Sequence, residues 1–148
     1  MKIVLQRVSR AEVRVSEKII GKIEKGLLLL VGIANEDNEQ ICDMMIDKII
    51  NLRIFEDSDG KMNLSLLDVH GELLVISQFT LYADCKGGRR PSFIGAAKRD
   101  IARPLYSKFL QKCSDRGVVT AQGEFGADMK VDFINDGPVT IILDSAVL

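Results

Sequence analysis

The sequence predicts an α+β fold: a single domain of residues 1–148, with two main helices covering twisted, largely antiparallel β-sheet layers. The chain has 148 residues, which fits one domain that buries roughly 68–70% of its unfolded surface. Hydrophobic residues make up 47% and charged residues 28% of the chain, an ordinary globular composition. The predicted element order is strands, helix, strand, helix and strands, which lacks the strict alternation of doubly wound folds.

Four strands are expected in the first 33 residues. Lys2 to Val8 and Ala11 to Val15 partly alternate between apolar and polar residues, and Ser9-Arg10 between them predicts a hairpin connection. Lys18 to Ile23 continues the β pattern. Gly26 to Ile33 contains an unbroken apolar run, which is typical of a fully buried strand.

The first helix is expected after the segment Asn35 to Asn38, because Asn and Asp side chains favour helix starts. Apolar residues then recur at helical spacing, which predicts one buried face. They are Ile41, Met45, Ile49 and Leu52.

The middle of the chain predicts two turns, a short edge strand, one long strand and a loop. In order, these are the turn Asp57 to Gly60, the edge strand Asn63 to Leu66, the turn His70-Gly71, the strand Glu72 to Leu81 and the loop Tyr82 to Gly95.

The second helix is expected to run to about Arg116, with Pro104 near its start and Gly117 ending it. Its apolar face holds Ile101, Leu105 and Phe109. The tail predicts three strands, with a turn at 135–138 between the last two. They are Val118 to Gln122, Lys130 to Ile134 and Val139 to Leu143.

Charge is distributed unevenly although the net charge is only −1. Residues 86–116 hold nine basic and two acidic residues, a net +7, and the rest of the chain carries −8. The balance argues against nucleic-acid binding by bulk electrostatics but leaves one region that attracts anions. On charge alone, a solvated helix face is the favoured interpretation.

The titratable inventory limits the possible chemistry. Cys42, Cys85 and Cys113 are widely spaced, and His70 is the single histidine, so neither a disulfide framework nor a metal site is predicted. No phosphate-binding glycine motif occurs, and no cofactor is predicted. The longest apolar run, Leu27 to Val31, is too short to span a membrane, and the cytoplasm is the expected location.

Two segments are chemically unusual. Ser77-Gln78-Phe79-Thr80 places polar residues at the end of an apolar strand, which is typical either of a solvated edge or of a strand end whose donors stabilise an oxyanion. Asn135-Asp136-Gly137-Pro138 puts a proline where the next strand should begin. Only about 5–6% of X–Pro bonds are cis, so this frequency alone favours a trans Gly137-Pro138 bond.

These segments resemble the SQFTL and NxGPVT motifs of bacterial and eukaryotic D-aminoacyl-tRNA deacylases, at Ser77 to Leu81 and Asn135 to Thr140. Three further stretches match family patterns, so the resemblance spans the chain. They are Gln6-Arg7-Val8 with Ala11 and Val13, Gly88 to Phe93, and Phe125 to Met129. One departure is Gly87, where many relatives have lysine.

The resemblance implies a homodimer of α+β subunits with active sites at the subunit interface. The implied reaction is hydrolysis of the ester that joins a D-amino acid to the terminal ribose of tRNA, or glycine mischarged onto tRNA(Ala), with rejection of L-aminoacyl-tRNA. The implied mechanism uses a ribose hydroxyl of the tRNA instead of a protein nucleophile. The implied partners are tRNA and a second subunit, with no DNA and no membrane.

The resemblance also assigns roles to residues. Ser77, Gln78, Phe79 and Thr80 would form the catalytic pocket, with backbone N–H groups near Phe79 and Thr80 facing the scissile carbonyl. The binding residues would be Gly137, Pro138, Arg7 and Met129: Gly137-Pro138 would be a cis dipeptide that excludes L side chains across the dimer, and Arg7 would orient it. We expect the basic stretch to contact tRNA phosphates, through Arg89, Arg90 and Arg99.

Two alternatives from other functional classes remain open. A non-catalytic RNA-binding module would account for the +7 segment. A conventional esterase would use Thr80 or Ser77 as its nucleophile.

Overall fold

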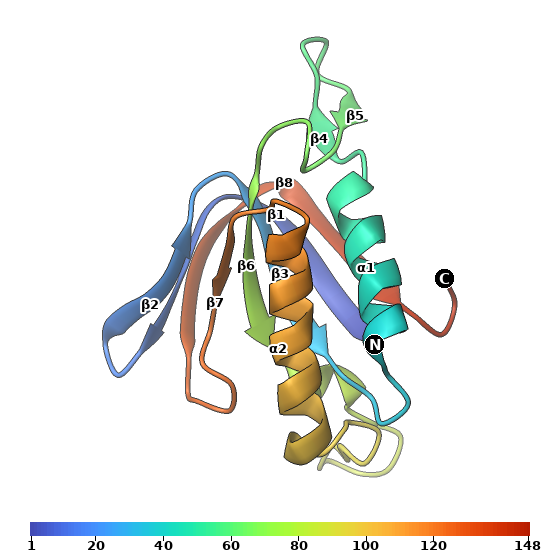
Figure 1. Ribbon diagram of the computed structural model, residues 1–148. Coiled ribbons are helices and arrows are strands. Elements are labelled where there is room, and N and C mark those ends of the chain that lie inside the picture. Colours follow the sequence, from blue (N-terminus) through green and yellow to red (C-terminus); the bar gives the residue numbers. More distant parts are fainter.

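The computed structural model describes all residues, 1–148, and has one six-stranded mixed sheet with two helices on one face, and a separate two-stranded sheet (Figure 1). The strands are β1 (Lys2–Val15), β2 (Lys18–Ile23), β3 (Gly26–Gly32), β4 (Phe55–Glu56), β5 (Met62–Leu64), β6 (Glu72–Ser77), β7 (Thr120–Gln122) and β8 (Lys130–Asp144). The helices are α1 (Glu39–Asn51), a short 3-10 helix η1 (Phe79–Tyr82) and α2 (Arg99–Asp115).

The main sheet has the order β2-β1-β3-β6-β7, and β8 pairs with the other side of β1. β1 is antiparallel to β2, β3 and β8, whereas β3–β6 and β6–β7 are parallel. The sheet curls until its end strands meet: a Cβ atom added to Gly21 of β2 would lie 2.6 Å from the carbonyl oxygen of Gln122 in β7. The α+β expectation with two main helices is confirmed, and the sheet is mixed.

The expected hairpin at Ser9-Arg10 is wrong. Residues 2–15 form one strand, and the chain reverses at Ser16-Glu17, where both residues have positive φ angles of 47° and 68°. β1 stays continuous because β8 pairs with it along nearly its whole length, with register shifts on either side of Val8. A shift of register of this kind bends a strand without ending it.

Three further boundaries differ from expectation. The strand expected over Glu72 to Leu81 ends at Ser77, after which the chain turns into η1. The segment Asn135 to Pro138 does not form a hairpin turn, because residues 130–144 run as one strand beside β1. The short edge strand is Met62–Leu64, and it pairs with β4 in a small separate arm.

Apolar residues are buried on both faces of the sheet. The larger core lies beneath the helices and includes the expected residues Met45 and Ile49 of α1 and Leu105 and Phe109 of α2. The smaller core, on the other face, contains Val8, Ala11, Val13, Ile23, Leu28, Leu74 and Ile76. Neither helix is long and apolar enough to cross a membrane.

Candidate active site

A mostly apolar cavity of about 400 Å³ opens where β6 ends. Its wall is built from the end of β6, the start of η1, the first turn of α2 and the connection between β7 and β8. A concave, largely apolar pocket with a few polar groups is the usual form of a small-molecule or substrate site. The polar groups that line this one are Ser77, Gln78, Arg99 and Asp128.

The Ser77 to Thr80 segment turns sharply at the pocket. The N–H of Gln78 donates to the carbonyl of Val31 at 2.8 Å, which is the last bond that holds this segment to β3. η1 then begins at Phe79, and the first N–H groups of a helical turn have no acceptor within that turn. N–H groups of this kind, beside an apolar pocket, are able to stabilise an oxyanion.

Side chains of this segment divide between the pocket and its support. Ser77, Gln78 and Phe79 line the cavity, whereas Thr80 does not. The Thr80 hydroxyl instead accepts a hydrogen bond from the Gln78 side-chain amide. The Thr80 hydroxyl therefore contacts Gln78 beside the cavity and does not form part of the cavity wall.

Gly137-Pro138 lies outside the cavity of its own chain, in an exposed part of β8. The peptide bond between the two residues is cis, as the resemblance implied. Asn135 holds the segment on its other side: its Oδ1 accepts from the Val139 N–H at 2.8 Å, and its Nδ2 donates to the Thr140 hydroxyl at 3.1 Å. Asn135 and Thr140 thus have a supporting contact that sequence reasoning did not assign.

Arg7 is the buried cation behind this segment, with 4% of its surface exposed. Its Nε donates to the Asp136 carbonyl at 2.8 Å, and its Nη1 donates to the Ile54 carbonyl at 2.6 Å. The Glu56 and Asp136 carboxylates lie 3.8 and 3.7 Å from the guanidinium. Arg7 therefore ties β8 to the base of the β4–β5 arm, a partner that only the tertiary structure reveals.

Of the other expected site residues, Met129 and Arg99 line the cavity, but Arg89 and Arg90 lie on the exposed loop between η1 and α2. Sequence reasoning assigned no role to Ala102 or Phe125, which also line it. Phe125 packs against the Tyr106 ring, with centroids 5.8 Å apart, and the Tyr106 hydroxyl donates to the Val75 carbonyl at 2.8 Å. The match of Phe125 to Met129 with family patterns was the available signal.

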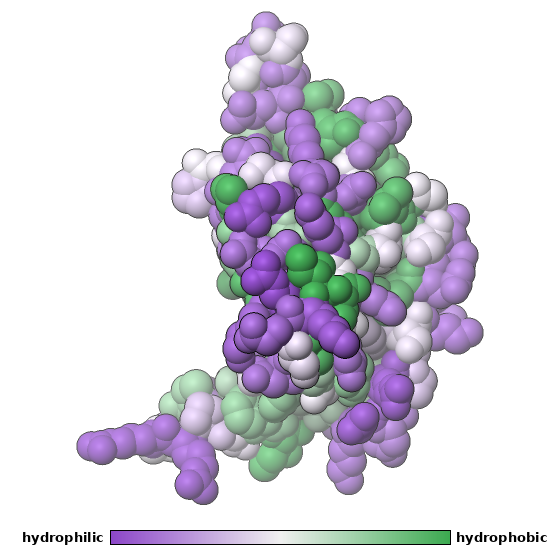
Figure 2. All heavy atoms as spheres, turned by 90° about the vertical axis from the view of Figure 1, so that its left-hand side faces the viewer, coloured by the Kyte–Doolittle hydropathy of each residue, from purple (hydrophilic) through white to green (hydrophobic).

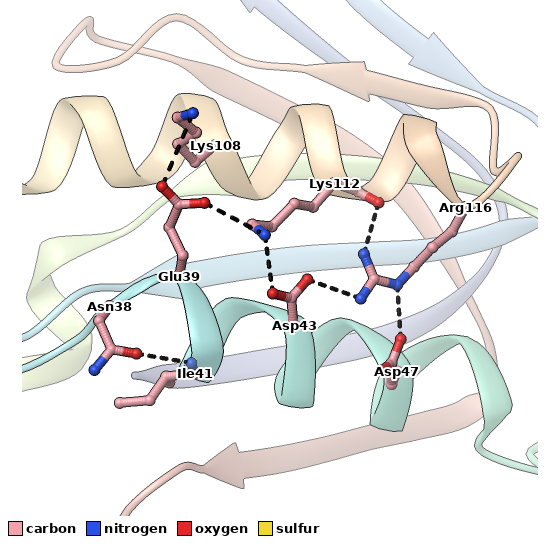
Figure 3. Close-up of polar contacts among 8 residues, drawn as sticks. All are labelled: Asn38, Glu39, Ile41, Asp43, Asp47, Lys108, Lys112 and Arg116. Carbon is pink, nitrogen blue, oxygen red and sulfur yellow. Dashed lines mark hydrogen bonds and ion pairs between the residues drawn. The ribbon is translucent and has the colours of Figure 1, made fainter.

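The basic segment divides into a paired and an unpaired group. Lys108 and Lys112 of α2, and Arg116 at its C-terminal cap, reach three carboxylates of α1 (Figure 3). The remaining cations of the segment form no ion pair, and all lie in the loop or the first turns of α2. They are Lys86, Arg89, Arg90, Lys98, Arg99 and Arg103. The unpaired positive charge thus gathers on the side of the molecule that holds the cavity.

The cavity is lined by no histidine and no cysteine, and its one carboxylate, Asp128, is ion-paired with Lys130 at 2.8 Å. His70 precedes the start of β6 and Ser77 ends it, and a six-residue strand is roughly 17–20 Å long. Burial raises the pKa of both Cys42 and Cys113 to about 12, so these thiols stay protonated. No group of three His, Cys, Asp or Glu side chains is placed to hold a metal ion. The arrangement offers hydrogen-bond donors and shape, with no acid–base pair.

Comparisons with known proteins agree with these features. Residues 4–144 match the family model described as D-Tyr-tRNA(Tyr) deacylase. A D-aminoacyl-tRNA deacylase of Clostridioides difficile is 56% identical over 99% of this chain and 98% of its own, and one of Clostridium kluyveri is 58% identical over 98% and 97%.

Two solved structures are also similar. One titled c-Myc DNA Unwinding Element Binding Protein has a TM-score of 0.91 and 41% identity, covering 97% of this chain and 98% of its own. One titled as a probable eukaryotic D-amino acid tRNA deacylase has a TM-score of 0.83 at 17% identity, over 96% and 97%, and shows likeness of fold. The chain belongs to the D-Tyr-tRNA(Tyr) deacylase family of hydrolases.

Proposed function

We propose that this D-aminoacyl-tRNA deacylase acts as a cytoplasmic homodimer that hydrolyses D-aminoacyl-tRNA, and glycyl-tRNA mischarged on tRNA(Ala), and rejects L-aminoacyl-tRNA. The observation that carries the proposal is the Ser77 to Phe79 turn, which lines a largely apolar cavity that has no histidine or thiol beside it and whose one carboxylate, Asp128, is ion-paired. An aminoacyl ester is activated, so held geometry and donors for its oxyanion suffice to speed its hydrolysis.

In this mechanism water attacks the ester carbonyl, and the backbone N–H groups at the start of η1, at Phe79 on the cavity wall and next to it at Thr80, stabilise the oxyanion that forms. The bond to the ribose oxygen then breaks, and that oxygen takes up the proton that the attacking water loses, so that the amino acid and the free ribose hydroxyl are released. The neighbouring ribose hydroxyl of the tRNA orients the attacking water. The cavity has no histidine and no thiolate, and its one carboxylate, Asp128, is engaged by Lys130, which supports a role for the substrate's own hydroxyl.

The filter against L-amino acids comes from the second subunit in this proposal. Gly137-Pro138 lies outside the cavity of its own chain, so it reaches an ester only in another copy. The outer edge of β8 is unpaired and carries exposed Ile134 and Ile142, and an open apolar edge of this kind is usually covered. Backbone carbonyls of Gly137-Pro138, on a segment that Arg7 anchors through the neighbouring Asp136 carbonyl, would occupy the space of an L side chain and leave room for D-residues and glycine.

The decisive experiment incubates the protein with D-aminoacyl-, L-aminoacyl- and glycyl-tRNA(Ala) and measures ester loss, with the mass in solution measured by light scattering. Loss from the D and glycyl esters alone, by a dimer, is the expected result. Ester loss from none of the substrates would indicate the non-catalytic RNA-binding module. Comparable loss from D and L esters would indicate a nonselective esterase.

The nucleophile is tested by Thr80→Ala. Because Thr80 lies outside the cavity lining and only braces Gln78, we expect this variant to keep substantial D-deacylation, within about tenfold of the parent kcat/KM. A loss as large as that of a triad serine would revive covalent catalysis and contradict the substrate-assisted mechanism.

A further inference from the structure

Two phenylalanine rings stand exposed at the mouth of the cavity. Phe79 is 56% exposed and Phe93 is 37% exposed, and their centroids are 5.1 Å apart with an angle of 72° between the ring planes. Such an edge-to-face pair is a favourable aromatic contact. Phe79 also lines the cavity, so the pair extends the cavity wall outward onto the surface.

The pair has little part in the core. Neither ring belongs to either buried apolar cluster, and the next residue, Ile94, is 88% exposed. In Figure 2 a projection extends from the lower left of the molecule. Its length is largely hydrophobic, and its tip is hydrophilic. Large apolar side chains left together in water indicate a binding surface.

The loop that carries Phe93 is held by backbone hydrogen bonds. Asp84 and Ser92 exchange two such bonds, at 2.7 and 2.9 Å, and the N–H of Ala97 donates to the Ile33 carbonyl at 2.8 Å. Phe93 follows this bridge directly, and its carbonyl accepts from the Ala96 N–H at 3.0 Å. The ring is therefore presented at a defined place, which lowers the entropy cost of binding against it.

Unpaired positive charge surrounds the rings. The tip of the same loop holds Lys86, Arg89 and Arg90, and the first turn of α2 beyond it begins with Lys98 and Arg99. None of these side chains has an acidic partner in the structure. Aromatic rings together with free cations form the usual binding surface for single-stranded nucleic acid, since bases stack on the rings and phosphates meet the cations.

We infer that the Phe79–Phe93 pair is the stacking platform for the nucleobase that precedes the terminal adenosine of tRNA. The inference rests on the proposed function, which places the aminoacylated adenosine in the cavity. Because Phe79 belongs to both the cavity wall and the pair, the single-stranded end of the tRNA passes the rings first as it leaves the cavity. Its phosphates then meet the loop and the start of α2. The platform would hold the single-stranded end in register with the ester.

The first test uses kinetics with substrates of two lengths. Base–aromatic stacking contributes about 5-fold to 150-fold to affinity. We expect Phe93→Leu to lower kcat/KM by that amount for a D-aminoacyl trinucleotide CCA and for D-aminoacyl-tRNA, and to leave D-aminoacyl-adenosine unchanged. Phe93→Tyr, which keeps the ring, should behave as the parent. An equal loss on D-aminoacyl-adenosine would mean that Phe93 only shapes the cavity, and would overturn the inference.

The second test needs no hydrolysis, so it separates this inference from the proposed function. The chain has no tryptophan, and Phe93→Trp would therefore place a single fluorophore on the platform. The CCA trinucleotide without an attached amino acid should quench this fluorescence, whereas adenosine should not. Met62→Trp, in β5 at the opposite end of the molecule, is the matched control and should respond to neither (Figure 1). If emission from the Phe93→Trp variant were blue-shifted and unchanged by CCA, a second subunit would cover the ring, and the inference would be overturned.

Discussion

Helix α2 carries basic side chains at both ends, but the two ends differ in what those side chains meet. Toward its C-terminal end, Lys112 lies 2.9 Å from Asp43, and Arg116 lies 2.9 Å from Asp43 and 2.6 Å from Asp47. At its N-terminal end, Lys98, Arg99 and Arg103 form no ion pair. Basic side chains thus join the two helices at one end of α2, whereas at the other end they remain free for an anionic ligand.

The paired end follows from matched spacing on parallel helices. Lys108, Lys112 and Arg116 repeat every four residues on α2, and Glu39, Asp43 and Asp47 do so on α1, so each set lies along one face (Figure 3). The hydrogen bonds from Lys112 and Arg116 hold the pKa of Asp43 below its ordinary value. The net +7 of the segment therefore overstates the charge that remains free to bind tRNA.

Neutralising the free group should have the largest effect. The triple variant Arg89→Gln, Arg90→Gln, Arg99→Gln is expected to weaken tRNA binding about tenfold or more at low salt and to reduce the log–log salt slope by about 3. Filter binding across a salt series measures both, and thermal unfolding should be unchanged. A salt slope equal to the parent's would show that these arginines are solvated surface residues that do not contact tRNA phosphates.

Arg7 tests a third environment, a buried cation that binds carbonyl groups. Arg7→Lys cannot reproduce the two bonds to the Asp136 and Ile54 carbonyls, because lysine lacks the planar fork of arginine. We expect the free energy of unfolding to fall by about 1–3 kcal/mol and L-aminoacyl-tRNA hydrolysis to rise relative to the D rate.

The matched control for that variant is Arg10→Lys. Arg10 makes an exposed ion pair with Asp132 at 2.9 Å on the same strand, and its replacement should change neither quantity. Denaturant unfolding and paired D and L assays provide the measurements. Unchanged L rejection in a folded Arg7→Lys variant would contradict a role for Arg7 in the filter.

Neutralising the paired end should give the converse result. The double variant Lys112→Gln, Arg116→Gln is expected to lower Tm by no more than a few degrees, since such pairs are partly solvated. Its tRNA affinity and salt slope should equal those of the parent. If this variant lost tRNA affinity as the loop triple variant does, the division of the helix into two functional ends would be wrong.

The smallest effect concerns pH. The pKa of Asp43 is lowered by folding, so its ion pairs stabilise the protein above its ordinary pKa of 3.8, and this stabilisation is lost as pH falls through the folded pKa. We expect Asp43→Asn to be less stable than the parent at neutral pH, with the difference shrinking below about pH 4. Urea unfolding from pH 7 to pH 3 measures it. Asp57 and Asp68, whose pKa values are also lowered by hydrogen bonds, are present in both proteins and cancel.

Local patterns of sequence determined the helices. In α1 the apolar spacing placed Met45 and Ile49 on the buried face, and the side chain of Asn38 caps the helix by accepting from the Ile41 N–H at 3.0 Å. Such signals suffice because a helix is built from contacts between residues three or four apart. The two motif segments were also recognised from sequence alone, since each is contiguous in the chain.

The tertiary structure alone decided where those segments act. Residues 2–15 form one strand, not a hairpin, because β8, more than a hundred residues later, pairs with them. Arg7 binds carbonyls at positions 54 and 136, and Phe93 meets Phe79 across a loop. Whether a cation of α2 is paired or free depends on which helix lies beside it. Periodicity reports which face of an element is buried, whereas partners distant in the chain are chosen by sheet register and packing, which no local pattern encodes.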